Sequence, residues 1–229
     1  MQLNNLSLSL LDIFALVWFL LCWIGYSHYV NNNPRSLMSK MREWRARWSL
    51  SMLRRDNRIV DSQVITGLNN VVTFFCSTSI FITAGLFAAM GASEQIVMIV
   101  NQLSFMQSTN IATVEMKIGL LIVILVYSFF KFGWAIKQHS YSAVVMAAVP
   151  DAKTADLRKD AQQAELMGKL SSLGAEHFND GIRAYYFALA TISWFIHPLI
   201  YIAIITWVVL VLHRRDFRSK LLKHLTEVS

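Results

Sequence analysis

Four long runs of apolar residues dominate the chain. Each is close to or longer than the roughly 20 residues that an α-helix needs to cross the hydrocarbon core of a bilayer. Polar and apolar residues do not alternate within them, and they are too long to be strands of a membrane β-barrel. The runs cover residues 8–29, 67–90, 118–136 and 184–212. We therefore predict an all-α fold, a polytopic transmembrane helical bundle with about four spans, which forms a single membrane domain over residues 1–229.

The fourth run, 184–212, is 29 residues long and would measure about 44 Å as one helix. Because the hydrocarbon core is about 30 Å thick, such a helix should tilt, kink or protrude. His197 and Pro198 stand near its centre. Pro198 has no backbone N–H, so a break in the helical hydrogen bonds is expected there.

Between the first two runs, residues 31–66 form a basic loop with an amphipathic pattern. Five large apolar residues recur at helical spacing on one face: Leu37, Met41, Trp44, Trp48 and Met52. Basic residues lie beside or opposite them: Arg35, Lys40, Arg42, Arg45 and Arg47. The pattern is typical of a helix that lies in the headgroup region, with its tryptophans toward the acyl chains and its guanidinium groups toward lipid phosphates. The alternative is a soluble basic helix that packs against the bundle's own loops.

The composition agrees with a membrane protein. Hydrophobic residues make up 55% of the chain and charged residues 15%, against about 25% charged in a soluble domain. The net charge of +7 could indicate nucleic acid, but the basic residues stand beside the apolar runs. A membrane surface with anionic headgroups is therefore the simpler partner. Cys22 and Cys76 both fall inside apolar runs, which excludes a disulfide framework and a cysteine zinc site.

The distribution of Lys and Arg orients the chain. The segment before the first run has none, residues 31–66 have eight, 91–117 one, 137–183 six, and the tail after Leu212 five. Since cytoplasmic loops are enriched in basic residues, we expect 31–66 and 137–183 in the cytoplasm and the N-terminus in the periplasm. Four spans would leave the basic tail outside as well. Either the tail tolerates this position, or the last segment turns back at His197-Pro198.

The second run carries an ordered set of polar residues. They follow a spacing of three and four, and so share one helix face: Gln63, Thr66, Asn70, Thr73 and Ser77. Ala84, Ala88 and Gly91 continue that face with small residues. The functional interpretation is the wall of an aqueous path or ligand cavity, because polar groups within a span cost free energy. The alternative is close helix packing, in which small and hydroxyl side chains allow contact across an interface.

Three further polar residues lie in or near the spans, and each has two interpretations. Asp12 is expected to be a solvated residue at a helix end, or, if it is buried, to need a cation or a polar partner. Lys131 is expected to extend its ammonium group toward the interface, or else to face an anion in a pore or form an intramembrane ion pair. His197 is expected to bond as a neutral group to a neighbouring helix, or to act as a proton relay, gating hinge or ligand contact.

Enzymatic signatures do not occur in the sequence. It has no glycine-rich phosphate loop, no HExxH motif and no GxSxG motif. Glu176, His177 and Asp180 stand close together before the fourth run, but three such residues on one stretch are a weak indication of a metal site. A polar stretch at the point of membrane entry explains them better. We expect a protein that is not an enzyme and that uses no metal and no cofactor.

Four strings occur in order along the chain: RDNRIVDSQ at 55–63, VTFFCST at 72–78, YSFFKF at 127–132 and RAYYFAL at 183–189. Together they resemble a bacterial inner-membrane family of unknown function, domain of unknown function 599 (DUF599), which has more distant relatives in plants. The resemblance spans nearly the whole chain. It implies a small helical membrane protein and supplies no activity, substrate or catalytic residue.

Three classes of function fit these features. The first is a homo-oligomeric channel or transport pathway, lined by the polar face of the second span and lying at a symmetry axis between subunits. The second is a non-transport scaffold, accessory subunit or lipid-interacting protein, which needs only the amphipathic loop and the packing faces. The third is an intramembrane enzyme that acts on lipid through His197. We take the first as the working hypothesis and the second as its main alternative.

Overall fold

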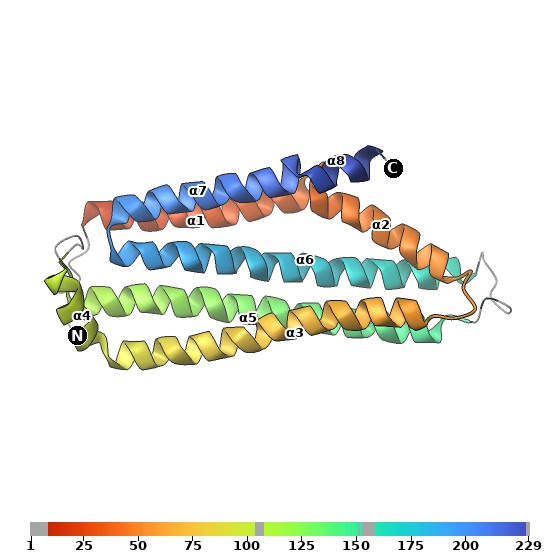
Figure 1. Cartoon of the computed structure of the whole chain (residues 1–229), viewed down its shortest axis with the longest axis horizontal. Helices are drawn as coiled ribbons and strands as arrows, with labels where there is room; N and C mark the ends of the chain where they lie inside the picture. The colour runs from red at the N-terminus through yellow and green to blue at the C-terminus, as the bar shows by residue number, and fades with distance from the viewer. Residues whose placement is uncertain (1–8, 104–107, 151, 153–158, 228–229) are drawn as a thin grey trace. The chain divides into compact units, whose positions relative to one another are not determined.

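The computed structural model describes residues 9–103, 108–150, 152 and 159–227, and these residues form helices with no strand among them (Figure 1). Leu8, where the first apolar run begins, lies outside the described part. The α-helices are α1 Leu10–Asn32, α2 Leu37–Met52, α3 Ile59–Gly91, α4 Ser93–Gln102, α5 Ile111–Ala148, α6 Ala161–Ile192, α7 Pro198–Arg218 and α8 Lys220–Glu227. The prediction of an all-α fold is confirmed.

Four helical stretches are long and apolar enough to cross a membrane. They are Leu10–Met52, which joins α1 and α2, Ile59–Gly91, Ile111–Ala148 and Pro198–Glu227, which joins α7 and α8. Many large apolar side chains on these stretches are exposed, among them Phe14, Phe81 and Trp207. Since soluble proteins rarely expose so many large apolar side chains together, these helices fit a hydrocarbon solvent. The chain is a multi-pass membrane protein.

Two of the helices are longer than the apolar runs that predicted them. α3 has 33 residues and α5 has 38, so they measure about 50 Å and 57 Å. A bilayer core of about 30 Å cannot hold either length without strong tilt. The predicted spans 67–90 and 118–136 are therefore the parts of α3 and α5 that suit lipid, while the rest of each helix suits a protein or aqueous environment.

The described chain forms two compact units. Unit 1 consists of the chain up to Val30 with residues 78–128 and 182–214, and unit 2 consists of residues 31–77 and 129–181 with the chain from Arg215 on. Among the described residues of the three basic segments, every Lys and Arg except Arg183 and Arg214 therefore belongs to unit 2.

An aromatic and polar core fills unit 1. Trp194 stacks on Tyr201 with ring centroids 5.1 Å apart, and Phe19 lies 6.0 Å from Phe187 and 6.1 Å from Tyr201. Asp12, only 2% exposed, accepts a hydrogen bond of 2.8 Å from the indole Nε1 of Trp194. The expectation of a solvated Asp12 is therefore wrong, because Asp12 lies on the buried side of α1 with Ala15 and has the polar partner that a buried charge requires.

The fourth predicted span, 184–212, is not one helix. α6 ends at Ile192, a short 3-10 turn follows at Ser193–Phe195, and α7 begins at Pro198. The end of α6 and the start of α7 run in opposite directions (Figure 1) and are joined by a bond of 3.2 Å between Thr191 and Tyr201. Pro198 explains the break, because proline cannot donate to the preceding turn and disfavours helical geometry in the residue before it.

Unit 2 has a core of its own at the ends of α3, α5 and α6. The buried apolar residues there are Met52, Leu53, Ile65, Met146, Val149, Ala164 and Met167. Arg58 donates to the carbonyl oxygens of Met146 and Val149 and so caps the last turn of α5. The buried carboxylate of Asp61 accepts from Trp48 at 2.6 Å and from Arg55. The string at 55–63 therefore ties α3 to α2 and α5.

Candidate functional site

The five polar residues predicted to line a path all lie on the exposed side of α3 and belong to unit 2. They are Gln63, Thr66, Asn70, Thr73 and Ser77. The opposite side of the helix carries Asp61, Ile65 and Val72, which are at most 4% exposed. The structure thus brings the five residues together on one face and leaves that face uncovered within unit 2.

This polar face has no partner in the part of the chain that the structure describes. None of its five side chains takes part in a side-chain hydrogen bond among those residues. Of the four candidate spans, α3 is also the least covered. In its most apolar stretch of 18 residues 11% of the residues are buried, against 44% in the corresponding stretch of α5. A lone polar face toward hydrocarbon is costly, so this face needs water, another polar surface, or both.

Lys131 has a specific partner and does not stand alone in the membrane. Its ammonium group donates to Asp180 Oδ2 on α6 at 2.7 Å, and Asn31 donates to Oδ1 of the same carboxylate at 3.2 Å. The side chains of Lys131 and Asp180 are 24% and 11% exposed. The geometry is that of an ion pair between α5 and α6, which was one of the alternatives for this lysine.

His197 lies in the connection between α6 and α7, and its predicted position near the middle of a span is wrong. Its Nδ1 accepts from the backbone N–H of Leu199 at 3.2 Å, which is a local turn contact. Because the helix ends before it, His197 does not sit at the depth where a polar group would be most costly.

Helix α2 holds six of the seven residues predicted to contact lipid headgroups, and the seventh, Arg35, lies in the turn before it. Trp48 packs against the core of unit 2 and donates to Asp61, so this tryptophan faces protein, as the packed-helix alternative requires. The others divide between exposed and partly covered residues: Arg35, Arg42 and Arg47 are exposed, and Lys40, Trp44 and Arg45 are partly buried. Arg47 stacks over the ring of Trp44 at 5.0 Å. The exposed arginines remain the candidates for headgroup contact.

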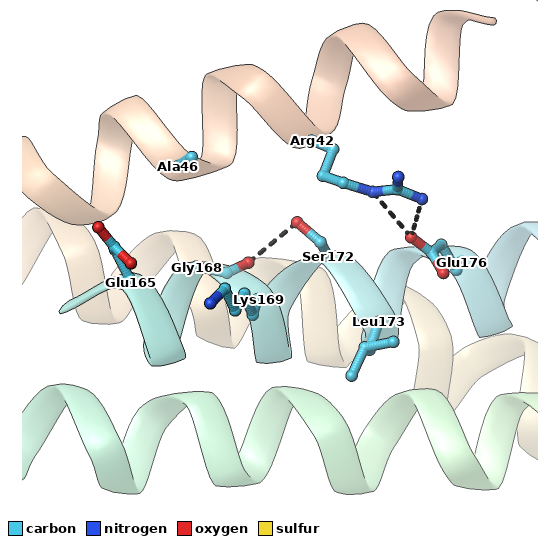
Figure 2. A pocket seen from close by; sticks show the side chains of 8 residues that line it. All are labelled: Arg42, Ala46, Glu165, Gly168, Lys169, Ser172, Leu173 and Glu176. Carbon is cyan, nitrogen blue, oxygen red and sulfur yellow. Dashed lines mark hydrogen bonds and ion pairs between the residues drawn. The ribbon is translucent and has the colours of Figure 1, made fainter. Parts of the chain in front are cut away.

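A cavity of about 530 Å³ opens between α2 and α6 within unit 2 (Figure 2). Its lining residues are Arg42, Ala46, Glu165, Gly168, Lys169, Ser172, Leu173 and Glu176. At one end Arg42 spans the two helices and donates to Glu176, with Nε 3.1 Å from Oε1. The two helices approach closely at Gly168, where a Cβ atom would lie 2.7 Å from Ser49 Oγ. Sequence reasoning missed this cavity, since its two walls are more than 100 residues apart.

The acidic and histidine residues before the fourth run do not come together as metal ligands. Glu176 pairs with Arg42, and Asp180 pairs with Lys131. The ring of His177 lies 6.5 Å from that of Trp134. Among the described residues, no group of three His, Cys, Asp or Glu side chains could hold a metal ion. These carboxylates instead balance basic side chains on neighbouring helices.

Comparison with known proteins defines the family. No curated protein and no solved structure shows a significant match to this chain. A family model does match, and it covers residues 14–221, which include all four strings on which the resemblance rested. The chain therefore belongs to the family described as protein of unknown function, DUF599.

Proposed function

We propose that the protein is a homo-oligomer of the bacterial inner membrane in which the polar faces of α3 from several subunits meet and line a path for water or ions. One observation supports this above the others: Gln63, Thr66, Asn70, Thr73 and Ser77 are all exposed, while the opposite face of the same helix is buried. A second copy supplies a matching polar surface, and rotational symmetry closes such contacts into a ring.

The free-energy cost of exposing polar groups to lipid favours an assembly over a monomer. Asn70 lies inside the apolar run 67–90, where an exposed amide has no water to bond. Amide and hydroxyl groups between membrane helices stabilise association by about 0.6–2 kcal/mol each. We therefore expect Asn70→Leu to weaken subunit association on the order of tenfold. Single-molecule photobleaching or cross-linking over a range of protein-to-lipid ratios measures that change, and unchanged association would contradict the proposed interface.

Thiol labelling tests whether the interface contains water. In a protein with Cys22 and Cys76 replaced, we expect cysteine at Thr73 to react with a membrane-impermeant thiol reagent. Val71→Cys is the matched control, because Val71 is 49% exposed but lies on the apolar side of α3, and so should face lipid and stay unlabelled. If cysteines placed singly at Asn70, Thr73 and Ser77 all fail to react with the reagent, a water-filled path along this face is rejected.

Flux separates this proposal from its main alternative. A scaffold, accessory subunit or lipid-interacting protein can use the same α3 interface without conducting anything. In proteoliposomes we expect ion or water flux that falls when Thr73 is replaced by leucine. Stable oligomers without flux, together with inert cysteines at the stripe, would favour the non-transport alternative.

The break at Ser193–Phe195 leads to a revised topology. If α6 crosses the membrane before this turn, with Glu176 and Asp180 neutralised by Arg42 and Lys131, the basic tail lies on the same side as residues 31–66 and 137–175. The side that holds eight, five and five basic residues would then be the cytoplasm, and Arg35 and Arg47 could contact its anionic headgroups.

This topology predicts the location of both ends of the chain. A fluorescent protein fused after Ser229 should fold and fluoresce in the cytoplasm, and alkaline phosphatase fused there should be inactive. The first described residues, at Ser9, should be accessible from the periplasm. Active phosphatase at the C-terminal fusion would restore the four-span arrangement.

A further inference from the structure

Helices α2, α5 and α6 of unit 2 pack together. Two sets of contacts show which of their residues lie opposite one another, that is, the register of the three helices. Between α2 and α6, Arg42 pairs with Glu176, and the backbone oxygen of Arg45 would lie 3.2 Å from a Cβ atom at Gly168. The side chain of Arg45 therefore projects from α2 beside the turn of α6 that lies between Gly168 and Glu176.

The contacts between α5 and α6 place His139 at the same level. A Cβ atom at Gly174 would lie 2.7 Å from the imidazole Cε1 of His139, and Ser142 donates to the carbonyl oxygen of Met167 at 3.1 Å. His139 is also near enough to Arg45 for the guanidinium charge to act on its ring. Ser171 stands one turn before Gly174. Arg45, His139 and Ser171, hereafter the α2–α5–α6 junction, thus come from three helices to one place.

Each member of this junction has a buried polar atom without a hydrogen-bond partner among the described residues. These atoms are Arg45 Nη1, His139 Nδ1 and Ser171 Oγ. His139 is 1% exposed and Ser171 is fully buried. Native proteins satisfy nearly all buried polar groups, so unsatisfied groups that gather in one place indicate a ligand or an ordered water.

The charge around the junction favours an anion over water. Glu176 and Arg42 are the charged groups that act on Arg45, and Glu176 is already engaged by Arg42. One guanidinium charge is therefore left without a counter-charge of its own. A guanidinium N–H, an imidazole N–H and a hydroxyl can all donate, and donors around a positive charge are the usual environment of a bound anion.

We propose that the α2–α5–α6 junction binds a small monovalent anion, with chloride as the probe, which accepts hydrogen bonds from Arg45, His139 and Ser171. The cavity of Figure 2 lies between the same helices α2 and α6, but Arg45, His139 and Ser171 are not among its lining residues, so the junction is a separate, buried site. This site is separate from the polar face of α3. If the junction binds no chloride, the proposed function is not contradicted.

Thermal unfolding of the full-length protein in detergent, followed by tryptophan fluorescence, tests the site. Sodium chloride is titrated against sodium gluconate at constant ionic strength, so that screening stays the same. A ligand that binds only the folded state raises the unfolding temperature as its concentration rises. We expect a chloride-dependent rise that saturates, and a half-saturating concentration on the order of tenfold higher in Ser171→Ala, which loses one hydrogen bond to a charged ligand.

Arg45→Met and Arg47→Met form the matched pair of variants. Arg47 lies on the same helix but is exposed over Trp44, so its variant should keep the full chloride response, and Arg45→Met should lose it. An equal response in the two variants, or no difference between chloride and gluconate in the unaltered protein, would overturn the proposal. If Arg45→Met does not fold, Ser171→Ala and His139→Gln decide the question, since an unchanged half-saturating concentration in both rejects the site.

Discussion

Replacement of Lys131 by methionine is expected to lower the free energy of unfolding by about 3 kcal/mol. The ammonium group of Lys131 is 2.7 Å from Asp180 Oδ2, and the aspartate side chain is 11% exposed. Methionine keeps most of the side-chain volume but removes the ammonium group that pairs with this covered carboxylate. Unfolding in detergent with increasing mole fraction of dodecyl sulfate, followed by far-UV circular dichroism, measures the loss.

A second variant separates the ion pair from simple packing. In Lys131→Met with Asp180→Leu, no uncompensated charge remains, so the double variant should regain most of the lost stability. The control is Lys40→Met, which removes a pair with the exposed carboxylate of Glu43 and should cost less than about 1 kcal/mol. A double variant as unstable as the sum of its two single variants would show that the ion pair is not what matters at this position.

Hydropathy predicted the lipid-facing part of the fold and little beyond it. The apolar run 8–29 corresponds to α1, and the runs 67–90 and 118–136 fall within α3 and α5. The first turns of α3 and both ends of α5 were not predicted as helix, because polar residues there are satisfied by other parts of the chain, as Asp61 is by Trp48 and Arg55. A search for continuous apolar residues cannot detect such compensation.

Helix α6 shows the same limit more clearly. Glu176 and Asp180 lower its hydropathy, so the sequence reads as a polar loop that precedes a span. Their partners Arg42 and Lys131 lie 134 and 49 residues away, and no local pattern connects them. The break before Pro198 did have a local signal, and turning back at this proline was one of the two explanations considered for the basic tail.

The sequence predicted which residues form the candidate site, but not whether other helices cover them. The spacing of Gln63, Thr66, Asn70, Thr73 and Ser77 placed them correctly on one helix face. Whether that face would be covered depends on which side of α3 meets α5 and α6, and Ile65 and Val72 settled this by packing inward. The junction of Arg45, His139 and Ser171 had no sequence signal, because it exists only through the register of three helices.

Glycines on α6 determine that register, and Gly181→Ala should show it. A Cβ atom there would lie 2.8 Å from Cδ1 and from Cζ of Phe132, a ring that is fully buried. Phe75 and Phe178, each with its ring centroid 5.8 Å from that of Phe132, leave the ring little room to move. Overpacking of this kind costs about 1–3 kcal/mol, so the variant should be destabilised by that amount.

The same exchange at Gly133 of α5 provides the control, because a Cβ atom there would meet nothing within 4 Å. Alanine is the better helix former by up to about 1 kcal/mol, so Gly133→Ala should stabilise the protein while Gly181→Ala destabilises it. Phe132→Leu combined with Gly181→Ala should be more stable than the two single effects predict, since the smaller side chain leaves room for the added methyl group. If both glycine variants shift stability in the same direction, the close contact of α5 and α6 at Gly181 is not what limits this position, and the helix register argued from it must be revised.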